Sequence, residues 1–343
     1  MKTIKLFAVL FCATVSLQAQ DIPNEKLSII AESHHQWTGI AMSQTNRMFV
    51  NFPRWSTDTP VAVAEIINGK VIPFPNVNWN KYESDANNHF TCVQSVFVDK
   101  ANQLWVLDTG YQLEQDKTKG AKLFVFDLKK NELKAAYDFP IEKITDRSYL
   151  NDFRIDEANA KVYLTDSRLG GLVVLNLKAK EVRRILANHP STLAEIPEII
   201  VESISRKKQV HSDGIELDKE RKYLYYCSLT GENLYRIPVK YIVDEKYDDV
   251  FLATKVEKFV KTGANDGIAF DSKGNLYLSS LEKNGISVVD KKGAFKTIIT
   301  DSLIQWPDSL AFGNDGALYF TTSLIHLPKD KRPTYKVFRL DLK

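Results

Sequence analysis

Six polar side chains occupy the same place in a sequence pattern that recurs along this chain. In each copy a polar residue opens a short apolar stretch, a turn follows and a second apolar stretch returns, as in Asp213-Gly-Ile-Glu-Leu-Asp218 followed by Tyr223-Leu-Tyr-Tyr-Cys-Ser228. The six opening residues are Thr38, Gln94, Asn151, Asp213, Asp266 and Asp308. Their carboxylate, amide and hydroxyl oxygens are hard donors, which suit one Ca²⁺ ion first, and Mg²⁺ or Mn²⁺ as alternatives, better than a soft metal. If the six openings converge in the fold, they predict a divalent-metal site or a polar ligand site.

Four of these residues are the candidate metal ligands: Asn151, Asp213, Asp266 and Asp308. The structural alternative is that Asp-Gly and Asn-Asp pairs form turns and bind backbone N–H groups. That alternative is favoured for Asp266 and Asp308, whereas Asn151 and Asp213 are predicted to be site residues. The aspartates that end the first stretches are interpreted as turn residues: Asp99, Asp156, Asp218 and Asp271.

The remaining candidates are predicted to bind an organic ligand: Thr38, Gln94, His211 and Trp306. His211 could carry a proton near Asp213, although a structural hydrogen bond is the favoured interpretation. Trp306 could line a pocket for an aromatic or amine ligand. Arg54-Trp55 could do the same, but a role in bracing the first two repeats is favoured. The adjacent His34 and His35 point to opposite sides of a strand, so a surface role is favoured for them.

The elements that must position these residues are the repeats themselves. The copies follow one another at intervals of roughly 40 to 60 residues, which is typical of the blades of a β-propeller. Five copies supply four strands each, and the sixth supplies three before the chain stops. The strand 27–31 belongs to no repeat, and it can complete the last blade and remove its exposed edge. The sequence thus predicts an all-β, six-bladed propeller closed by an N-terminal strand.

The predicted strands have the following ranges. They are 38–43, 47–52, 61–67 and 70–74; 94–99, 104–109, 122–128 and 133–138; 151–156, 162–166, 171–177 and 181–186; 213–218, 223–228, 233–238 and 256–261; 266–271, 276–280, 285–290 and 295–300; 309–312, 318–322 and 336–341. Two insertions interrupt this series, at 188–210 and 241–255. Insertions in a propeller emerge on its faces, where they either cover a pocket or decorate the surface.

The ends and the charge of the chain indicate where it works. Residues 1–19 have the basic start, apolar run and small final residue of a signal peptide, so we expect export to the periplasm or the cell exterior. Residues 20–343 are predicted to form a single domain and a monomer. The formal charge of +3 falls further when Lys2 and Lys5 are removed, which gives no electrostatic reason to expect nucleic acid or an anionic membrane as partner. No later segment is long and apolar enough to predict membrane insertion.

The cysteines and the absence of several motifs reduce the number of chemical activities expected of this chain. Cys92 and Cys227 remain beyond the signal peptide, and they are interpreted as two buried free thiols, with a disulfide as the alternative. The sequence contains no Gly-rich phosphate loop, no Gly-x-Ser-x-Gly, no Cys-x-x-Cys and no His-Glu-x-x-His pattern. These absences argue against nucleotide use, serine hydrolysis and zinc chemistry.

Several blocks of sequence resemble the yellow/major royal jelly protein family. They are Asn46-Arg-Met-Phe-Val-Asn-Phe-Pro-Arg-Trp55, Leu104-Trp-Val-Leu-Asp-Thr-Gly110, Tyr163-Leu-Thr-Asp-Ser167, His211-Ser-Asp-Gly-Ile215 and Trp306-Pro-Asp-Ser309. The resemblance covers nearly all of the chain after the signal peptide. It implies a six-bladed propeller, in agreement with the strand count. It also implies a secreted protein that binds small amines in its central channel or, as in some yellow proteins, converts dopachrome.

A more distant similarity is to the senescence marker protein/gluconolactonase propellers, which hydrolyse sugar lactones with one divalent metal. The resemblance implies that Asn151 and Asp213 match two of the metal ligands, and that Asp213 matches the general base. Thr38 stands where those relatives have a Glu ligand, which weakens the expectation of the same hydrolysis. The expected function is therefore binding of a small organic molecule in the channel. Metal-dependent lactone hydrolysis and a non-catalytic scaffold for a protein partner are the alternatives.

Overall fold

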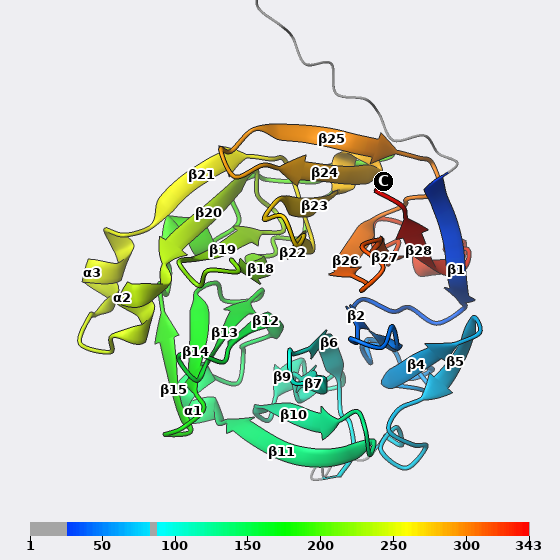
Figure 1. The fold of residues 1–343 in the computed structure, drawn as a ribbon, viewed down its shortest axis with the longest axis horizontal. Helices are drawn as coiled ribbons and strands as arrows, with labels where there is room; N and C mark the ends of the chain where they lie inside the picture. Colours follow the sequence, from blue (N-terminus) through cyan, green and yellow to red (C-terminus); the bar gives the residue numbers. More distant parts are fainter. Residues whose placement is uncertain (1–25, 83–87, 343) are drawn as a thin grey trace, which may run out of the picture.

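Six four-stranded antiparallel sheets are arranged in a ring around a central axis (Figure 1). This computed structural model describes residues 26–82 and 88–342. The sheets confirm the predicted all-β, six-bladed propeller. The predicted signal peptide, residues 1–19, lies outside the described residues.

The strands have the following bounds. The first sheet contains β2 (Ile40–Met42), β3 (Met48–Asn51), β4 (Val63–Ile67) and β5 (Lys70–Pro73). The second contains β6 (Val93–Val98), β7 (Gln103–Asp108), β10 (Ala121–Asp127) and β11 (Glu132–Phe139). The third contains β12 (Leu150–Asp156), β13 (Lys161–Asp166), β14 (Leu172–Asn176) and β15 (Glu181–Ile185).

The other three sheets follow the same order. The fourth contains β18 (Ser212–Leu217), β19 (Tyr223–Ser228), β20 (Asn233–Pro238) and β21 (Glu257–Lys261). The fifth contains β22 (Ile268–Phe270), β23 (Leu276–Ser280), β24 (Gly285–Val289) and β25 (Phe295–Thr300). The sixth contains β26 (Pro307–Phe312), β27 (Leu318–Thr322), β28 (Tyr335–Leu340) and β1 (Leu27–Ser33).

The sixth sheet takes its outer strand from the other end of the chain. β1 pairs antiparallel with β28, so that Leu27 lies opposite Leu340 and Ser33 lies opposite Tyr335. In Figure 1 the two strands lie side by side at the edge of the ring. The first and last strands of the described chain thus share one sheet.

The turn between the first two strands of most repeats is held by an aspartate side chain. The Asp218 carboxylate accepts hydrogen bonds from the backbone N–H groups of Lys222 and Tyr223, at 2.6 and 3.0 Å. Asp271 accepts in the same way from Asn275, at 2.8 Å. An aspartate side chain stabilises a tight turn by binding the backbone N–H groups that follow it. The predicted turn role of these aspartates is confirmed.

Apolar side chains fill the spaces between neighbouring sheets. Six clusters of buried side chains each join two adjacent sheets, and aromatic residues such as Phe49, Phe153 and Phe320 are fully buried in them. Burial of this apolar surface is the main favourable term that holds the ring together. Cys92 and Cys227 are buried and free, as expected.

The two insertions lie in different places. Residues 188–210 form a 3₁₀ turn (η2, Pro190–Thr192) and a hairpin of β16 (Ile199–Val201) and β17 (Ile204–Arg206). Residues 241–255 overlap two short helices, α2 (Val239–Val243) and α3 (Asp249–Ala253), at the outer edge of the ring (Figure 1). The first insertion therefore reaches the region of the channel and the second does not.

A few short elements were not predicted. A small hairpin of β8 (Tyr111–Gln112) and β9 (Lys117–Thr118) precedes β10, and α1 (Ile141–Ile144) follows β11. Two further 3₁₀ turns are η3 (Leu281–Lys283) and η4 (Lys329–Lys331). None of the helices in the described ranges has the length and apolar character needed to cross a lipid bilayer.

Candidate functional site

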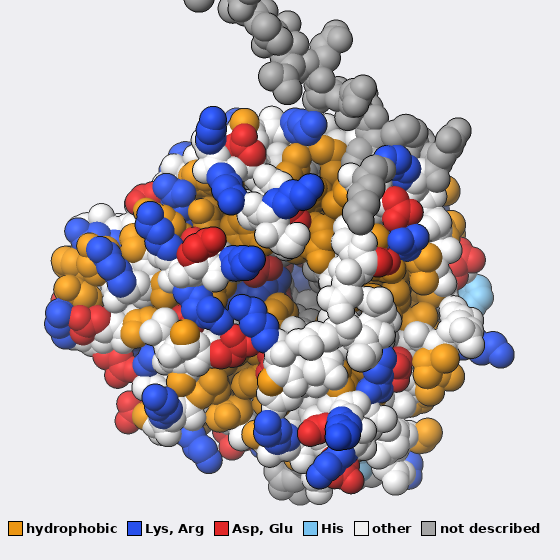
Figure 2. All heavy atoms as spheres, in the orientation of Figure 1, with side chains coloured by type: hydrophobic (Ala, Val, Ile, Leu, Met, Phe, Trp, Pro, Cys, Tyr) orange, Lys and Arg blue, Asp and Glu red, His pale blue; other side chains and the backbone are white. Residues whose placement is uncertain are grey.

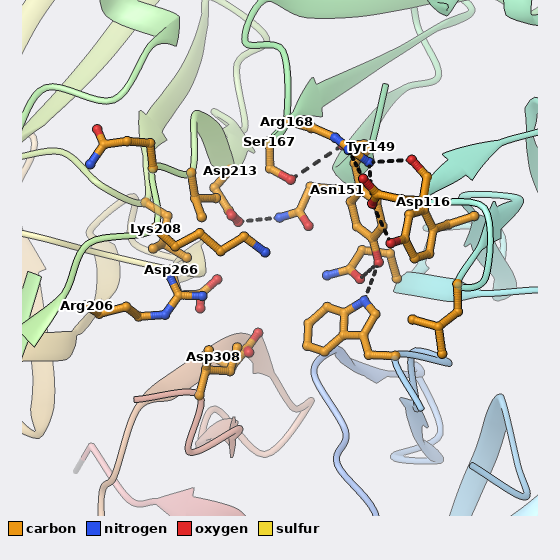
Figure 3. Close-up of a pocket in the computed structure, with 18 residues that line it drawn as sticks. Asp116, Tyr149, Asn151, Ser167, Arg168, Arg206, Lys208, Asp213, Asp266 and Asp308 are labelled. Carbon is orange, nitrogen blue, oxygen red and sulfur yellow. Dashed lines mark hydrogen bonds and ion pairs between the residues drawn. The ribbon is translucent and has the colours of Figure 1, made fainter. Parts of the chain in front are cut away.

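A cavity of about 540 Å³ opens at one end of the central channel. The surface is hollowed near the centre of the ring in Figure 2, and Figure 3 shows the side chains that line the cavity. Its volume is in the range of small-molecule binding sites in proteins. The lining residues are Trp55, Gln94, Tyr111, Leu113, Asp116, Tyr149, Asn151, Ser167, Arg168, Arg206, Lys208, Gln209, Val210, Asp213, Leu229, Asp266, Asp308 and Ile325.

Five of the six opening residues line this cavity because each lies at the start of an innermost strand. The strand register shifts at these points in β6, β12, β18 and β26. A β-bulge of this kind leaves a residue outside the regular ladder and re-aims its side chain. The structure thereby brings together Gln94, Asn151, Asp213, Asp266 and Asp308.

The three aspartates are buried and influence one another. Burial and the neighbouring Asp266 and Asp308 carboxylates raise the pKa of Asp213 well above its usual range. Burial and Asp266 likewise raise the pKa of Asp308. Burial raises the pKa of Asp266 to about 6, and a hydrogen bond from Trp306 limits the rise. These carboxyl groups therefore hold protons at a pH where an exposed aspartate is ionised.

Asp213 has a direct partner from the next sheet. The Asn151 side-chain amide donates a hydrogen bond to the Asp213 carboxylate. The backbone carbonyl of Asp213 also accepts a hydrogen bond from the Thr165 hydroxyl, at 2.7 Å. Asn151 and Asp213 are thus side by side at the cavity, as the sequence comparison with lactonases implied.

Two cations from the 188–210 insertion face these carboxylates. Arg206, at the end of β17, lies beside Asp266, and Lys208 projects into the cavity between Asp213 and Asp308 (Figure 3). Sequence reasoning did not identify either residue. The run Arg206-Lys-Lys208 carries no periodicity that would distinguish a cavity-lining cation from a solvated one.

The opposite side of the cavity is aromatic. The Trp55 indole N–H donates to the Tyr149 hydroxyl at 2.6 Å, and this hydroxyl donates to Gln94 Oε1 at 2.7 Å. Tyr111 packs edge-on against Tyr149, with ring centroids 5.5 Å apart. Burial raises the pKa of Tyr149 well above its usual range, so the hydroxyl stays protonated and can donate. Trp55, Tyr111 and Tyr149 thus form a fixed apolar wall.

An ion pair stands beside the aromatic wall. The Tyr111 hydroxyl donates to Asp116 at 2.8 Å, and Arg168 pairs with the same carboxylate at 2.6 Å. This pair neutralises Asp116. Of the Arg54-Trp55 dipeptide, Trp55 lines the cavity, whereas Arg54 is buried and binds the backbone carbonyls of the neighbouring loop, including Thr91 at 3.1 Å.

Three predicted ligand-binding residues do not line the cavity. The Thr38 hydroxyl donates to the Gln94 carbonyl oxygen at 3.2 Å and accepts from Asn51 at 3.0 Å. His211 Nδ1 accepts a hydrogen bond from the Ala194 backbone N–H, at 2.9 Å. Trp306 lies behind Asp266 and donates its indole N–H to Asp266 Oδ2 at 2.8 Å. The structure gives these three side chains supporting contacts around the site.

Residues of β12 and β18 that follow Asn151 and Asp213 in the sequence form an ion cluster. Arg154 pairs with Asp152 and with Glu216, both at 3.0 Å. These three residues line a second cavity, of about 410 Å³, at the other end of the channel. Within the described residues the two cavities share no lining side chain.

A divalent ion such as Ca²⁺ needs several oxygen ligands arranged around one point. Within residues 26–82 and 88–342, no group of three or more His, Cys, Asp or Glu side chains is arranged to hold a metal ion. Thr38, which stands at the position of the third lactonase ligand, is turned toward Asn51. Arg206 and Lys208 also stand among the carboxylates (Figure 3). The side chains as arranged do not fit a metal held by protein ligands alone, and binding of Ca²⁺ stays a prediction.

Known propellers resemble this chain in fold. A gluconolactonase from Xanthomonas campestris superposes with a TM-score of 0.58 at 13% identity, covering 92% of this chain and 89% of that one. A luciferin-regenerating enzyme superposes with a TM-score of 0.59 at 14% identity, covering 92% and 94%. At such low identity, these structures support the fold alone.

Sequence comparison identifies nearer relatives. Major royal jelly protein 7 of Apis mellifera is 27% identical over 245 residues, which are 69% of this chain and 55% of that protein. Dopaminechrome tautomerase of Drosophila melanogaster is 20% identical over 301 residues, covering 77% and 64%. The chain spans about half the length of the first curated relatives that it matches. The model of the major royal jelly protein family matches residues 91–320, and the chain belongs to this family.

Proposed function

We propose that this chain binds a small organic molecule in the cavity at the mouth of the propeller. The observation that carries the proposal is the cavity itself, whose 540 Å³ combines an aromatic wall with charged groups on the facing side. Pockets of this size with a few convergent polar groups on an apolar lining are the usual form of a small-molecule site.

Ligand binding has a direct test. A molecule that binds only the folded state raises the melting temperature in proportion to its concentration over Kd. We expect at least one compound from a panel of phenolic amines, catechols, aromatic acids and sugar acids to raise it. No shift across the panel at millimolar concentration would contradict the proposal and would favour a scaffold for a protein partner.

We propose that Asp213 provides proton transfer if the ligand is turned over. A tautomerase removes a proton from one atom of its substrate and returns a proton to another. A carboxyl group with a raised pKa can do both near neutral pH. Asp213 lines the cavity, and burial together with the neighbouring Asp266 and Asp308 carboxylates raises its pKa. The support is this geometry together with the similarity to dopaminechrome tautomerase.

We expect Asp213→Asn to lower the rate of dopaminechrome conversion by about 100-fold or more, if the wild-type protein catalyses it. The rate is followed by absorbance under single-turnover and steady-state conditions. Asp290→Asn is a matched control, because Asp290 is a turn residue that accepts backbone hydrogen bonds far from the cavity. A wild-type rate in the Asp213→Asn variant would exclude the assigned role.

Metal-dependent lactone hydrolysis is the second candidate function. It is favoured by one observation, the contact between Asn151 and Asp213 at the cavity. Asp266 and Asp308 lie in the same cavity and would be the further ligands.

Native mass spectrometry before and after chelation tests this candidate. One tightly held Ca²⁺, lost in Asn151→Ala and in Asp213→Ala, would support it and would make lactone assays the next step. A protein that remains metal-free in millimolar Ca²⁺ would contradict it.

The prediction of export is tested separately by fractionation of cells that express the full chain. The prediction of a monomer is tested by the mass of the protein in solution.

A further inference from the structure

Two cations in the cavity have unused hydrogen-bond donors. Among the described residues, the Arg206 guanidinium makes no hydrogen bond or ion pair, and its buried Nη1 has no hydrogen-bond partner. It lies over the Trp306 ring, 5.3 Å from the centroid. The Lys208 ammonium points into the open cavity (Figure 3). By contrast, Arg168 in the same cavity is committed to Asp116.

The backbone beneath these cations is held in place. At the tip of the β16–β17 hairpin, the Glu202 carboxylate accepts from Asn284 at 2.7 Å and from Gln305 at 2.9 Å. Beyond the hairpin, the carbonyl oxygen of Lys208 accepts from the Thr230 hydroxyl at 3.2 Å. A site whose donors are fixed before binding loses less entropy when its ligand arrives.

The charge of the lining favours an anion more than the count of acidic residues suggests. Asp116 is neutralised by Arg168. The Asp213 carboxylate accepts a hydrogen bond from Asn151, and the Asp266 carboxylate accepts one from Trp306, so both already have donors within the protein. The Lys208 ammonium forms no ion pair with a carboxylate of the described residues, and desolvation together with the nearby Arg206 lowers its pKa. A bound anion would supply a compensating negative charge.

We propose that the ligand of this cavity is a small aromatic carboxylate, whose carboxylate binds Arg206 and Lys208 and whose ring packs against Trp55 and Tyr149. Guanidinium and ammonium groups bind a carboxylate through charge-assisted hydrogen bonds, and Arg can do so with two parallel bonds. Tyr149 lies across the cavity from the cations (Figure 3), and its hydroxyl accepts the hydrogen bond from the Trp55 indole. This inference rests on the proposed function, since it names the chemical class of the molecule bound at the same site.

The first experiment compares three probes that share one skeleton. They are 3-(4-hydroxyphenyl)propionate, tyramine and 4-ethylphenol, which carry a carboxylate, an ammonium and no charge. Isothermal titration of the wild-type protein at pH 7.5 should give a Kd for the acid at least about tenfold lower than for the neutral phenol, because a charge-assisted hydrogen bond contributes more than a neutral one. Added salt should weaken binding of the acid more than binding of the phenol.

Variants then identify the groups responsible. Lys208→Met and Arg206→Met should each weaken binding of the acid about tenfold or more and leave binding of the phenol unchanged. Lys207→Met is the matched control, because Lys207 is an exposed neighbour that does not line the cavity. Lys208→Glu should reverse the preference, so that tyramine binds better than the acid. Lys208 is itself exposed, so its replacement tests the proposal without threatening the fold.

The outcomes separate this inference from the proposed function. Tyramine or the phenol binding at least as tightly as the acid would overturn the inference and leave the proposed function standing. An unchanged Kd for the acid in both Lys208→Met and Arg206→Met would do the same. Failure of all three probes to bind would overturn the inference and count against the proposed function for aromatic ligands.

Discussion

Desolvation decides the behaviour of the three aspartates at the mouth of the channel. Asp213, Asp266 and Asp308 are each less than a tenth exposed. Asp266 keeps the lowest pKa of the three because the Trp306 indole N–H and the Arg206 charge favour its ionised form. The three groups are close enough to titrate together, so their protons leave in steps that belong to the set. The described residues that line the site include no histidine, so its pH-dependent charge comes from these aspartates.

A first prediction concerns stability and pH. Because the pKa of Asp266 is raised to about 6 in the folded state, the folded protein binds more protons than the unfolded chain between about pH 4 and pH 6. The contribution of Asp266 to stability is therefore present at pH 4 and is lost as the pH rises through 6. Asp266→Asn should stabilise the protein at pH 8, by at most about 3 kcal/mol, and should have little effect at pH 4.

Urea unfolding of both proteins at pH 4 and pH 8, with a chelator present, measures the difference. The Asn side chain can still accept the hydrogen bond from Trp306 through its amide oxygen. Equal destabilisation of the variant at both pH values would show that Asp266 is ionised and well paired in the folded protein.

At the residue scale the sequence predicted part of the site. The opening residues could be identified because the repeat places them at equivalent strand starts, and five of the six line the cavity. Thr38 does not, because its short side chain is satisfied by Asn51 and by the Gln94 carbonyl. Arg206 and Lys208 could not be predicted, since their position depends on how an insertion without a repeat folds back over the ring.

The β16–β17 hairpin is the element that completes the site. Its inner residues Ile199 and Val201 pack with Leu229, Leu281 and Trp306 in a separate apolar cluster. At its tip, Glu202 also contacts His326 Nε2 at 3.0 Å. The hairpin is thus attached to two other sheets, which fixes the direction of the cations that follow it.

A second prediction tests this attachment. Glu202→Ala removes the acceptor for Asn284, Gln305 and His326. We expect backbone amides of the hairpin to exchange hydrogen about tenfold faster, which corresponds to about 1.4 kcal/mol of lost local stability. Hydrogen exchange with mass spectrometry of peptides that cover residues 196–210 measures the change.

Glu198→Ala is the control for this variant. Glu198 accepts a hydrogen bond from Ser205 within the exposed part of the hairpin and does not attach it to another sheet. Equal acceleration in both variants would show that the tip contacts do not restrain the hairpin. The global melting temperature should change little in either case, because the six apolar clusters between the sheets are untouched.

The hairpin also shows what the sequence could not predict at the element scale. Its turn is formed by Glu202 and Ser203, with φ of 51° and 66°. Two-residue hairpin turns with positive φ usually contain Asn, Asp or Gly, which tolerate that conformation. Glu-Ser gives no such signal, and each strand has only three residues. The Asn68-Gly69 turn, by contrast, has residues that tolerate positive φ and joins β4 to β5.

At the scale of the whole molecule the prediction was most complete. Six sheets follow from six copies of one pattern, because each sheet needs apolar neighbours on both sides to bury its faces. The predicted and observed strands differ at their ends. β2 and β22 have three residues each, whereas the corresponding predicted strands are longer. The opening residues lie at or just before these ends, outside regular pairing, which is where strand length is hardest to predict.

A third prediction concerns the strand shared between the two ends of the chain. A protein that begins at His34 lacks β1, so that β28 becomes an unpaired edge strand. Residues that pack against Ala31 in the complete protein, such as Val337, become exposed. We expect a melting temperature lower by 5 °C or more, on the order of 1 to 2 kcal/mol for a chain of this size, and a tendency to associate. Thermal unfolding and light scattering measure both effects.

The comparison protein begins at Lys26 and keeps β1. If the two shortened proteins melt at the same temperature and remain equally monodisperse, β1 contributes little to the stability of the ring. A synthetic peptide with the sequence of residues 26–34 should restore the melting temperature of the shorter protein if the strand acts by pairing with β28.

The pairing of Leu27 with Leu340 also has a consequence in time. During synthesis β1 is made first and its partner β28 is made last, so this contact forms only after nearly the whole chain is available. Contacts between residues so distant in sequence form slowly. Until then five sheets can assemble, but the sixth lacks its outer strand. Partly folded states with an unpaired strand edge are prone to aggregate. Substitutions in β1 and β28 should therefore reduce the fraction of newly made chains that reach the native state. They should have a smaller effect on how tightly the correctly folded molecules bind the ligand of the cavity.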